Sequence, residues 1–242
     1  MNPEIIDVLD HDPDLAVDLE GSRLSTATRD LRATAFYVPG GRWDPDGHAP
    51  GLRGGIGLLL LDGVLARRVG TKRRSGAELL GPGDLLRPAP GDGGSEAAFR
   101  TSWRVIEPLH VAVLDQRFLM RLAPYPEIAA QLIGRAVDRA RHVLVHMAIA
   151  HHPRVDARLL HLLWQLADRW GRVTPQGVLL PLRLTHELLA DLVAAQRPSV
   201  TLSLQQLEAQ GQITREDGRM LLLGRPPAPA PERERPRAAL AG

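Results

Sequence analysis

The C-terminal third of the chain has the most regular pattern of hydrophobic and polar positions. Thr185 can cap a helix whose apolar face is formed by Leu188, Leu189, Leu192 and Val193. A second helix is predicted over about residues 197–210, with Pro198 in its first turn and Gly211 just past its end. The inward positions of this helix recur at three- and four-residue spacing: Val200, Leu204 and Leu207.

Two short β patterns follow these helices. Residues 213–215 and 220–222 flank Asp217-Gly218, a dipeptide that favours a tight hairpin turn. Two helices, a short turn between them and a β-ribbon predict a winged helix-turn-helix over residues 183–223.

From Ala35 onward the chain consists of short apolar runs separated by glycine and proline, which predicts a β-sandwich or barrel of roughly 80 residues. Residues 58–61 and 64–69 are predicted to form one hairpin that turns at Asp62-Gly63. Residues 88–95 are predicted to be a loop, and the first 34 residues to hold one or two helical turns.

A long helix is predicted from Glu127 to His151. Apolar residues step along it by four, three, four and three, which is the spacing of a coiled-coil seam: Ile133, Val137, Ala140, Leu144 and Met147. Such a seam favours dimerisation, and the alternative is a helix that packs only on its own β-domain. His152-Pro153 ends the helix.

The next predicted helix starts at Asp156, which is expected to cap it, and is apolar around more than half its circumference as far as Trp170. Val173 and residues 178–182 are expected to form a small ribbon. After Gly224 the chain is rich in proline and arginine without an apolar period, so residues 225–242 are predicted to be disordered.

Composition narrows the class of protein. The 242 residues, 44% of them hydrophobic, can form two modest domains. The absence of cysteine excludes disulfides, thiolate zinc sites and cysteine-held iron–sulfur clusters. No apolar run is long enough to span a membrane, and the acidic N-terminus does not resemble a signal peptide, so a cytoplasmic location is expected.

Candidate catalytic and metal-binding chemistry is sparse. The sequence shows no Ser/His/Asp constellation, P-loop or dinucleotide-binding glycine motif in the required context, so no enzymatic activity is predicted. His142 and His146 share a helical face, but no acidic residue or cysteine completes an evident ligand set near them. We therefore expect no metal and no cofactor.

The order of a β-rich region, a long helix and a winged helix-turn-helix resembles the Crp/Fnr family of bacterial transcription regulators. The resemblance is strongest over LTHELLADLVAAQRPSVTLSLQQLEAQGQI and also includes the step Gly83-Asp84-Leu85. It implies an α+β fold with an N-terminal β-barrel (double-stranded β-helix) sensor at residues 1–123. It further implies a dimerisation helix at 124–152, a DNA-binding domain at 153–224 and a homodimer that binds double-stranded DNA and contacts RNA polymerase.

The effector site departs from the cyclic-AMP-binding members of that family. Arg87-Pro88 stands where they carry a glutamate, and Phe99-Arg100 stands where they carry Arg-Ser. Loss of a bidentate guanidinium from its place removes the strongest contact to a cyclic phosphate. An effector other than cyclic AMP, or none, is expected, and Arg87, Phe99 and Arg100 are the candidate ligand-binding residues.

The same resemblance implies the DNA contacts. Arg197 aligns with an arginine that reads guanine, and a guanidinium matches the O6 and N7 acceptors of that base. Ser199 aligns with a phosphate-binding residue, whereas Leu202 and Gln205 are expected to face the groove. Thr201 completes the predicted set.

The net charge of the predicted DNA-binding segment argues against DNA binding. Residues 181–224 contain four arginines and five acidic residues, although DNA binding needs a positive surface. The five arginines of residues 135–158 are expected to supply the missing positive charge. The alternative hypothesis is a winged-helix protein-interaction module attached to a degenerate, ligand-free barrel.

Overall fold

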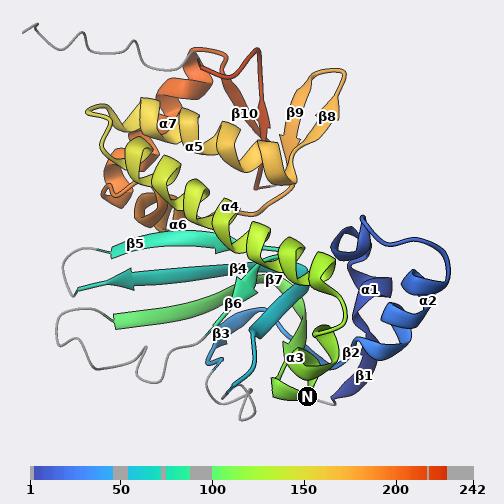
Figure 1. The fold of residues 1–242 in the computed structure, drawn as a ribbon. Coiled ribbons are helices and arrows are strands. Elements are labelled where there is room, and N and C mark those ends of the chain that lie inside the picture. The colour runs from blue at the N-terminus through green and yellow to red at the C-terminus, as the bar shows by residue number, and fades with distance from the viewer. Residues whose placement is uncertain (1–2, 46–53, 72–74, 88–99, 217, 228–242) are drawn as a thin grey trace, which may run out of the picture.

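The computed structural model describes residues 3–45, 54–71, 75–87, 100–216 and 218–227. It has an α+β fold with a β-rich N-terminal part, one long helix and a C-terminal group of helices and short strands (Figure 1). The predicted loop at 88–95, Phe99, and the predicted disordered tail from residue 228 onward lie outside the described residues.

The N-terminal part is built on a seven-stranded antiparallel sheet. Its strands are β1 (Glu4–Asp7), β2 (Arg32–Val38), β3 (Gly41–Trp43), β4 (Gly57–Gly70), β5 (Ser75–Leu80), β6 (Leu85–Leu86) and β7 (Arg100–Leu114). The main path runs β1-β2-β7-β4-β5, while β3 pairs with β7 and β6 pairs with β4. Because β1 and β5 remain as edges, the sheet forms an open roll, and the prediction of a barrel needs this correction.

The predicted hairpin at residues 58–69 is wrong. These residues belong to the single strand β4, which pairs with β7 from Gly57↔Leu114 to Gly70↔Arg100. The register shifts on both sides of Asp62, so Asp62-Gly63 forms a bulge within the strand. Gly63 has a φ of 87°, and a Cβ there would lie 2.1 Å from the carbonyl oxygen of Pro108. The same dipeptide that favours a turn therefore bends a continuous strand here.

The first 31 residues are more structured than predicted. Besides β1 they form α1 (Val8–His11), a 3-10 turn at Pro13–Ala16 and α2 (Gly21–Asp30). Their apolar side chains share a buried cluster with α3 (Gln116–Leu122) and with Ile128 and Leu132 of the long helix. This N-terminal segment thus fixes the start of the long helix to the sheet.

The long helix α4 spans Pro126–Ala150, one residue earlier at each end than predicted. It runs between the roll and the C-terminal helices (Figure 1). All five residues of the predicted seam are exposed in the single chain, with Ile133 at 66% and Leu144 at 65%. The seam is therefore not used for packing within the chain.

The C-terminal part contains α5 (Val155–Trp170), α6 (His186–Leu192) and α7 (Arg197–Ala209). A four-stranded sheet in the order β10-β11-β9-β8 covers them, formed by β8 (Arg172–Thr174), β9 (Gly177–Leu180), β10 (Ile213–Glu216) and β11 (Arg219–Leu222). The predicted ribbon at 173–182 is confirmed, and it pairs with the predicted wing.

The expected cap of α5 is wrong. Arg154 has the extended backbone of the N-cap, and Asp156 lies in the first turn, where it accepts a hydrogen bond of 3.1 Å from the Arg154 guanidinium. This bond from Arg154 lowers the pKa of Asp156. The Asp156 carboxylate therefore bonds Arg154 and backbone N–H groups of the first turn, but Arg154 is the N-cap residue.

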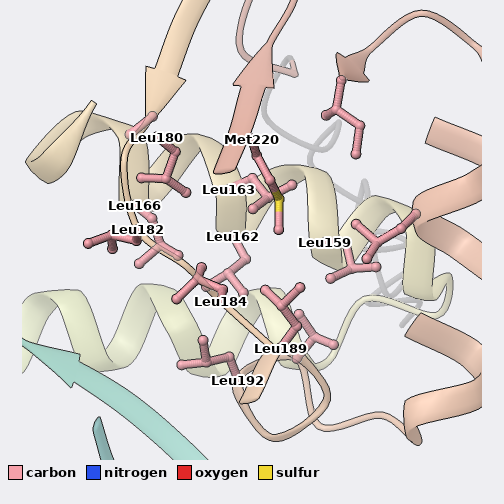
Figure 2. Close-up of a cluster of buried hydrophobic side chains, with 14 of the residues drawn as sticks. Leu159, Leu162, Leu163, Leu166, Leu180, Leu182, Leu184, Leu189, Leu192 and Met220 are labelled. Atoms are coloured by element: carbon pink, nitrogen blue, oxygen red, sulfur yellow. The ribbon is translucent and has the colours of Figure 1, made fainter. Parts of the chain in front are cut away.

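One buried leucine-rich cluster holds the C-terminal part together (Figure 2). Leu159, Leu162 and Leu166 of α5 face Leu182, Leu184 and the side chains of α6. The cluster also includes Val64, Ala66 and Leu79 of the roll. The C-terminal part is thus docked onto the sheet through a shared apolar core.

Candidate nucleic-acid interface

Local signals in the sequence explain the geometry of α6 and α7. The Thr185 hydroxyl accepts a hydrogen bond of 3.2 Å from the Leu188 N–H and so caps α6, as predicted. Pro198 lies in the first turn of α7, and Gly211 beyond its end has a φ of 67°. Ala194, in the turn between the helices, has the unusual positive φ of 51°. This geometry fixes the angle at which α7 leaves α6.

The inward and outward faces of α7 are clearly separated. Val200, Leu204 and Leu207 are buried, as the spacing predicts. The predicted DNA-contacting residues Arg197, Ser199, Leu202 and Gln205 are exposed, Leu202 at 67%. These four side chains offer a partner, in that order, a guanidinium, a hydroxyl, a methyl-bearing chain and an amide.

Thr201 is engaged within the protein. Its hydroxyl donates to the Arg197 carbonyl oxygen at 3.1 Å and lies 2.9 Å from Nδ1 of His186. On the other side of the imidazole, Nε2 lies 3.3 Å from Nη1 of Arg215. Arg215 in turn donates to Glu208 at 2.7 Å. We infer that Thr201 helps to orient α7 against α6 and the wing.

His186 is a candidate functional residue that the sequence did not predict, since nothing in the motif marks the first residue of α6. Burial lowers its pKa, and the charges of Arg215 and Arg197 lower it further. A neutral imidazole with its proton on Nδ1 can donate to Thr201 and accept from Arg215 at the same time. The structure therefore favours the neutral form.

An arginine-lined cleft separates α7 from the roll. Its volume is about 730 Å³, and Arg42, Arg104, Arg183 and Arg197 line it together with Arg68. The first four make no ion pair with any residue that the structure describes. Three of the five arginines come from the roll. The sheet therefore supplies positive charge beside α7, and residues 181–224 alone lack this charge.

Arg68 connects the roll to α6. Its guanidinium donates to Glu187 at 3.1 Å and also bonds Asp191, which accepts a second bond from the Ser75 hydroxyl. Two of the five acidic residues of 181–224 are paired with Arg68 in this way, and Glu208 is paired with Arg215 of the same stretch.

The arginines of residues 135–158 do not supply the expected positive field. Four of the five are paired with carboxylates: Arg135 with Asp12, Arg139 with Glu78, Arg141 with Asp138 and Arg154 with Asp156. The fifth, Arg158, donates to backbone carbonyls. This expectation is corrected by the cleft, which is lined by four arginines that form no ion pair within the described residues.

The candidate effector residues are not gathered in one place. Arg87 follows β6 and lies beside Gly57, whereas Arg100 pairs with Gly70 at the opposite end of β4. Both side chains are exposed, and Phe99 is outside the described residues. The interior of the roll is filled by buried apolar side chains that include Trp43 and Trp103.

The histidines of α4 have other contacts. His146 bonds the Leu192 carbonyl oxygen. Within the described ranges, no group of three or more histidines or acidic residues could hold a metal ion. In the same ranges no helix is both long and apolar enough to cross a membrane.

Comparisons with known proteins agree with this arrangement. Residues 157–226 match the family model of the Crp-like helix-turn-helix domain. Over 219 residues the chain is 28% identical to the CRP-like cAMP-activated global transcriptional regulator of Mycobacterium tuberculosis, and the alignment covers 85% of this chain and 89% of that protein.

Solved structures share the fold. A CooA variant from Carboxydothermus hydrogenoformans has a TM-score of 0.61 at 18% identity, covering 86% of this chain and 89% of that one. FixK2 from Bradyrhizobium japonicum has a TM-score of 0.60 at 17% identity, covering 80% and 93%. Residues 157–226 are thus a Crp-like helix-turn-helix domain, and the chain as a whole is similar in sequence to a CRP-like transcription regulator and shares the fold of CooA and FixK2.

Proposed function

We propose that the chain, as a homodimer, places α7 in the major groove of double-stranded DNA and reads its operator with Arg197. The separation of α7 into a buried apolar face and an exposed polar row carries this proposal, because a groove-reading helix needs both. Leu202 contacts a thymine methyl, and Ser199 and Gln205 bond phosphates or base edges. Thr201 acts through its bond to His186.

The exposed seam of α4 is the proposed dimer interface. Its apolar residues stand unpartnered over four turns, and a parallel copy of the same helix would cover them. The two recognition helices would then have to lie about 34–36 Å apart to enter successive major grooves. In this dimer each chain has a sensor domain at 1–123, a dimerisation helix at 124–152, a DNA-binding domain at 153–224 and a tail at 225–242. The dimer acts in the cytoplasm, where RNA polymerase is a further partner.

Arg197 faces the cleft beside the roll, and this position suggests how the activity is controlled. A duplex is far wider than a cleft of this size, so DNA reaches Arg197 only when the C-terminal part moves away from the sheet. The ion pairs of Arg68 with α6 oppose this movement. An effector that favours one arrangement shifts the population between binding and non-binding states.

We further propose that the effector differs from cyclic AMP, although the Mycobacterium tuberculosis relative is described as cAMP-activated. The positions that hold a glutamate and an Arg-Ser pair in cyclic-AMP binders are Arg87-Pro88 and Phe99-Arg100 here. The separation of Arg87 from Arg100 along β4 gives no common anion site for the two.

Fluorescence anisotropy with a labelled fragment of the protein's own promoter tests the proposal at 50 and 200 mM salt. We expect affinity to fall steeply with salt, as phosphate contacts require. Arg197→Ala should reduce specific affinity about fivefold or more, whereas Arg172→Ala, an exposed arginine on β8, should leave it unchanged. Absence of binding at low salt would instead favour the protein-interaction module.

A further inference from the structure

A second cavity lies where the three parts of the chain meet. It has a volume of about 470 Å³, within the range of small-molecule sites, and its walls come from β5 of the roll, α4, α5 and the end of α6. It is distinct from the interior of the roll, which is filled by the apolar cluster around Trp43 and Trp103.

Most of the cavity wall is apolar. Leu79 of β5 and Val143 of α4 form one side, and Leu162, Leu166 and Leu192 form the other. The last three are also part of the leucine cluster, where Leu162 and Leu192 lie on the side toward α4 (Figure 2). A molecule in this cavity would bury a hydrocarbon or aromatic body.

Four of the charged groups in the wall are paired with one another, and the fifth, Asp168, is exposed and forms no ion pair within the described residues. Arg139 donates to Glu78 at 2.8 Å and to the Leu85 carbonyl oxygen at 2.7 Å. Arg169 pairs with Asp84 at 2.7 Å. Since a charged ligand would have to displace one of these pairs, the site favours an uncharged one.

Two buried polar atoms in the wall lack a partner. Oε1 of Gln165 and Nε1 of Trp170 have no hydrogen bond to any residue that the structure describes. An unsatisfied buried acceptor or donor costs about 1–3 kcal/mol in free energy, so an atom that faces the cavity gains from a ligand group that bonds it. Gln165 requires a donor, whereas Nε1 of Trp170 lies against Gly81, which does not line the cavity.

We propose that this junction cavity binds an uncharged amphipathic molecule with an aromatic or aliphatic body and at least one N–H or O–H donor directed to Gln165. The ligand contacts the roll, α4 and α5 together, so it binds the docked arrangement more tightly than an opened one. If the proposed function holds, the ligand therefore lowers affinity for DNA, because Arg197 faces the roll in the docked state.

Titration of the full chain with N-phenyl-1-naphthylamine tests the site directly. This probe is uncharged, has one N–H and becomes more fluorescent in apolar surroundings. We expect saturable enhancement with one site per chain and about twofold to tenfold weaker binding to Gln165→Leu, which keeps the side-chain size but loses the acceptor. Val143→Trp should fill the cavity and abolish binding.

Gln206→Leu is the matched control, because Gln206 is exposed on α7 away from the cavity, and its binding should equal that of the wild type. Circular dichroism melts verify that each variant folds. An unsaturable signal, or equal affinity for the wild type and Gln165→Leu, would overturn the proposal.

A charged analogue tests the requirement for neutrality. The dye 8-anilino-1-naphthalenesulfonate has the same rings with a sulfonate, and we expect its signal to be the same in the wild type, Gln165→Leu and Val143→Trp. A sulfonate signal that disappears in both variants would contradict an uncharged ligand. Neither titration contains DNA, so a negative result in them does not bear on the proposal that α7 binds DNA. Likewise, a negative anisotropy experiment does not bear on ligand binding in the cavity.

Discussion

Single residues hold the reading helix in place through hydrogen bonds that link three elements. Thr201 on α7, His186 on α6 and Arg215 on β10 form one chain of contacts, with Glu208 at its end. The imidazole accepts from a permanently charged guanidinium, so the network requires it to be neutral. We therefore expect the orientation of α7 to depend on the protonation state of His186.

This dependence predicts a pH effect on stability. The pKa of His186 is lowered in the folded chain, so the unfolded chain binds a proton first as the pH falls below about 6.5. The contribution of His186 is present above that pH and is lost below it. Thermal unfolding at pH 7.5 and 5.5 should show a larger loss for the wild type than for His186→Gln, and equal losses would contradict the network.

At the scale of elements, strand β4 shows what local pattern could and could not predict. The helix-turn-helix was predictable because its caps, Pro198 and Gly211 act within a few residues. Asp62-Gly63 gave the wrong element because the choice between a turn and a bulge depends on β7, more than 40 residues away, which pairs along the whole of β4. Pairing with a distant strand decided the structure.

The bulge requires a glycine at position 63, so a substitution there should lower the stability of the fold. In Gly63→Ala the new Cβ would collide with the Pro108 carbonyl and the backbone would keep a positive φ, so we expect a loss of about 2–4 kcal/mol in the free energy of unfolding. Gly76→Ala on β5 is the control, because a Cβ there meets nothing within 4 Å. Urea unfolding of both variants measures the difference, and similar stabilities would argue against the bulge.

Helix α4 carries the prediction about assembly. Leu144 lies in the exposed seam, and a carboxylate there would be buried without a partner in a dimer. Sedimentation equilibrium should show a dimer for the wild type and a folded monomer for Leu144→Glu. Val173→Glu, at a residue 89% exposed on β8, should remain dimeric. A dimer that survives Leu144→Glu would place the interface elsewhere.

At the scale of the whole molecule, the C-terminal part is docked on the roll, and Arg197, the proposed base-reading residue, faces the cleft beside the sheet. This arrangement could not be predicted from the sequence, because the arginines of the cleft are spread from residue 42 to residue 197 and come together only in the folded chain. The charge deficit counted within the motif was accurate, but Arg68, which lies outside the motif, pairs with two of its five acidic residues.

Release of the docked state should increase DNA binding. Arg68→Ala removes the link to Glu187 and Asp191, and exposed or half-exposed pairs of this kind contribute about 0.5–1.4 kcal/mol, so affinity should rise about twofold to tenfold. Arg32→Ala, which breaks a pair with Asp7 far from α6, should have no effect. Weaker DNA binding by Arg68→Ala would indicate that the docked state is the one that binds.

The central claim is that Arg197 reads a guanine from the N-terminal end of α7. A double-mutant cycle tests it most directly, with the wild type and Arg197→Ala measured against the selected operator and against versions in which each G·C pair is changed to A·T. We predict that one symmetric G·C pair costs the wild type about 1–3 kcal/mol per half-site and costs Arg197→Ala almost nothing. If every substitution costs both proteins the same, Arg197 does not read a base and the account is wrong.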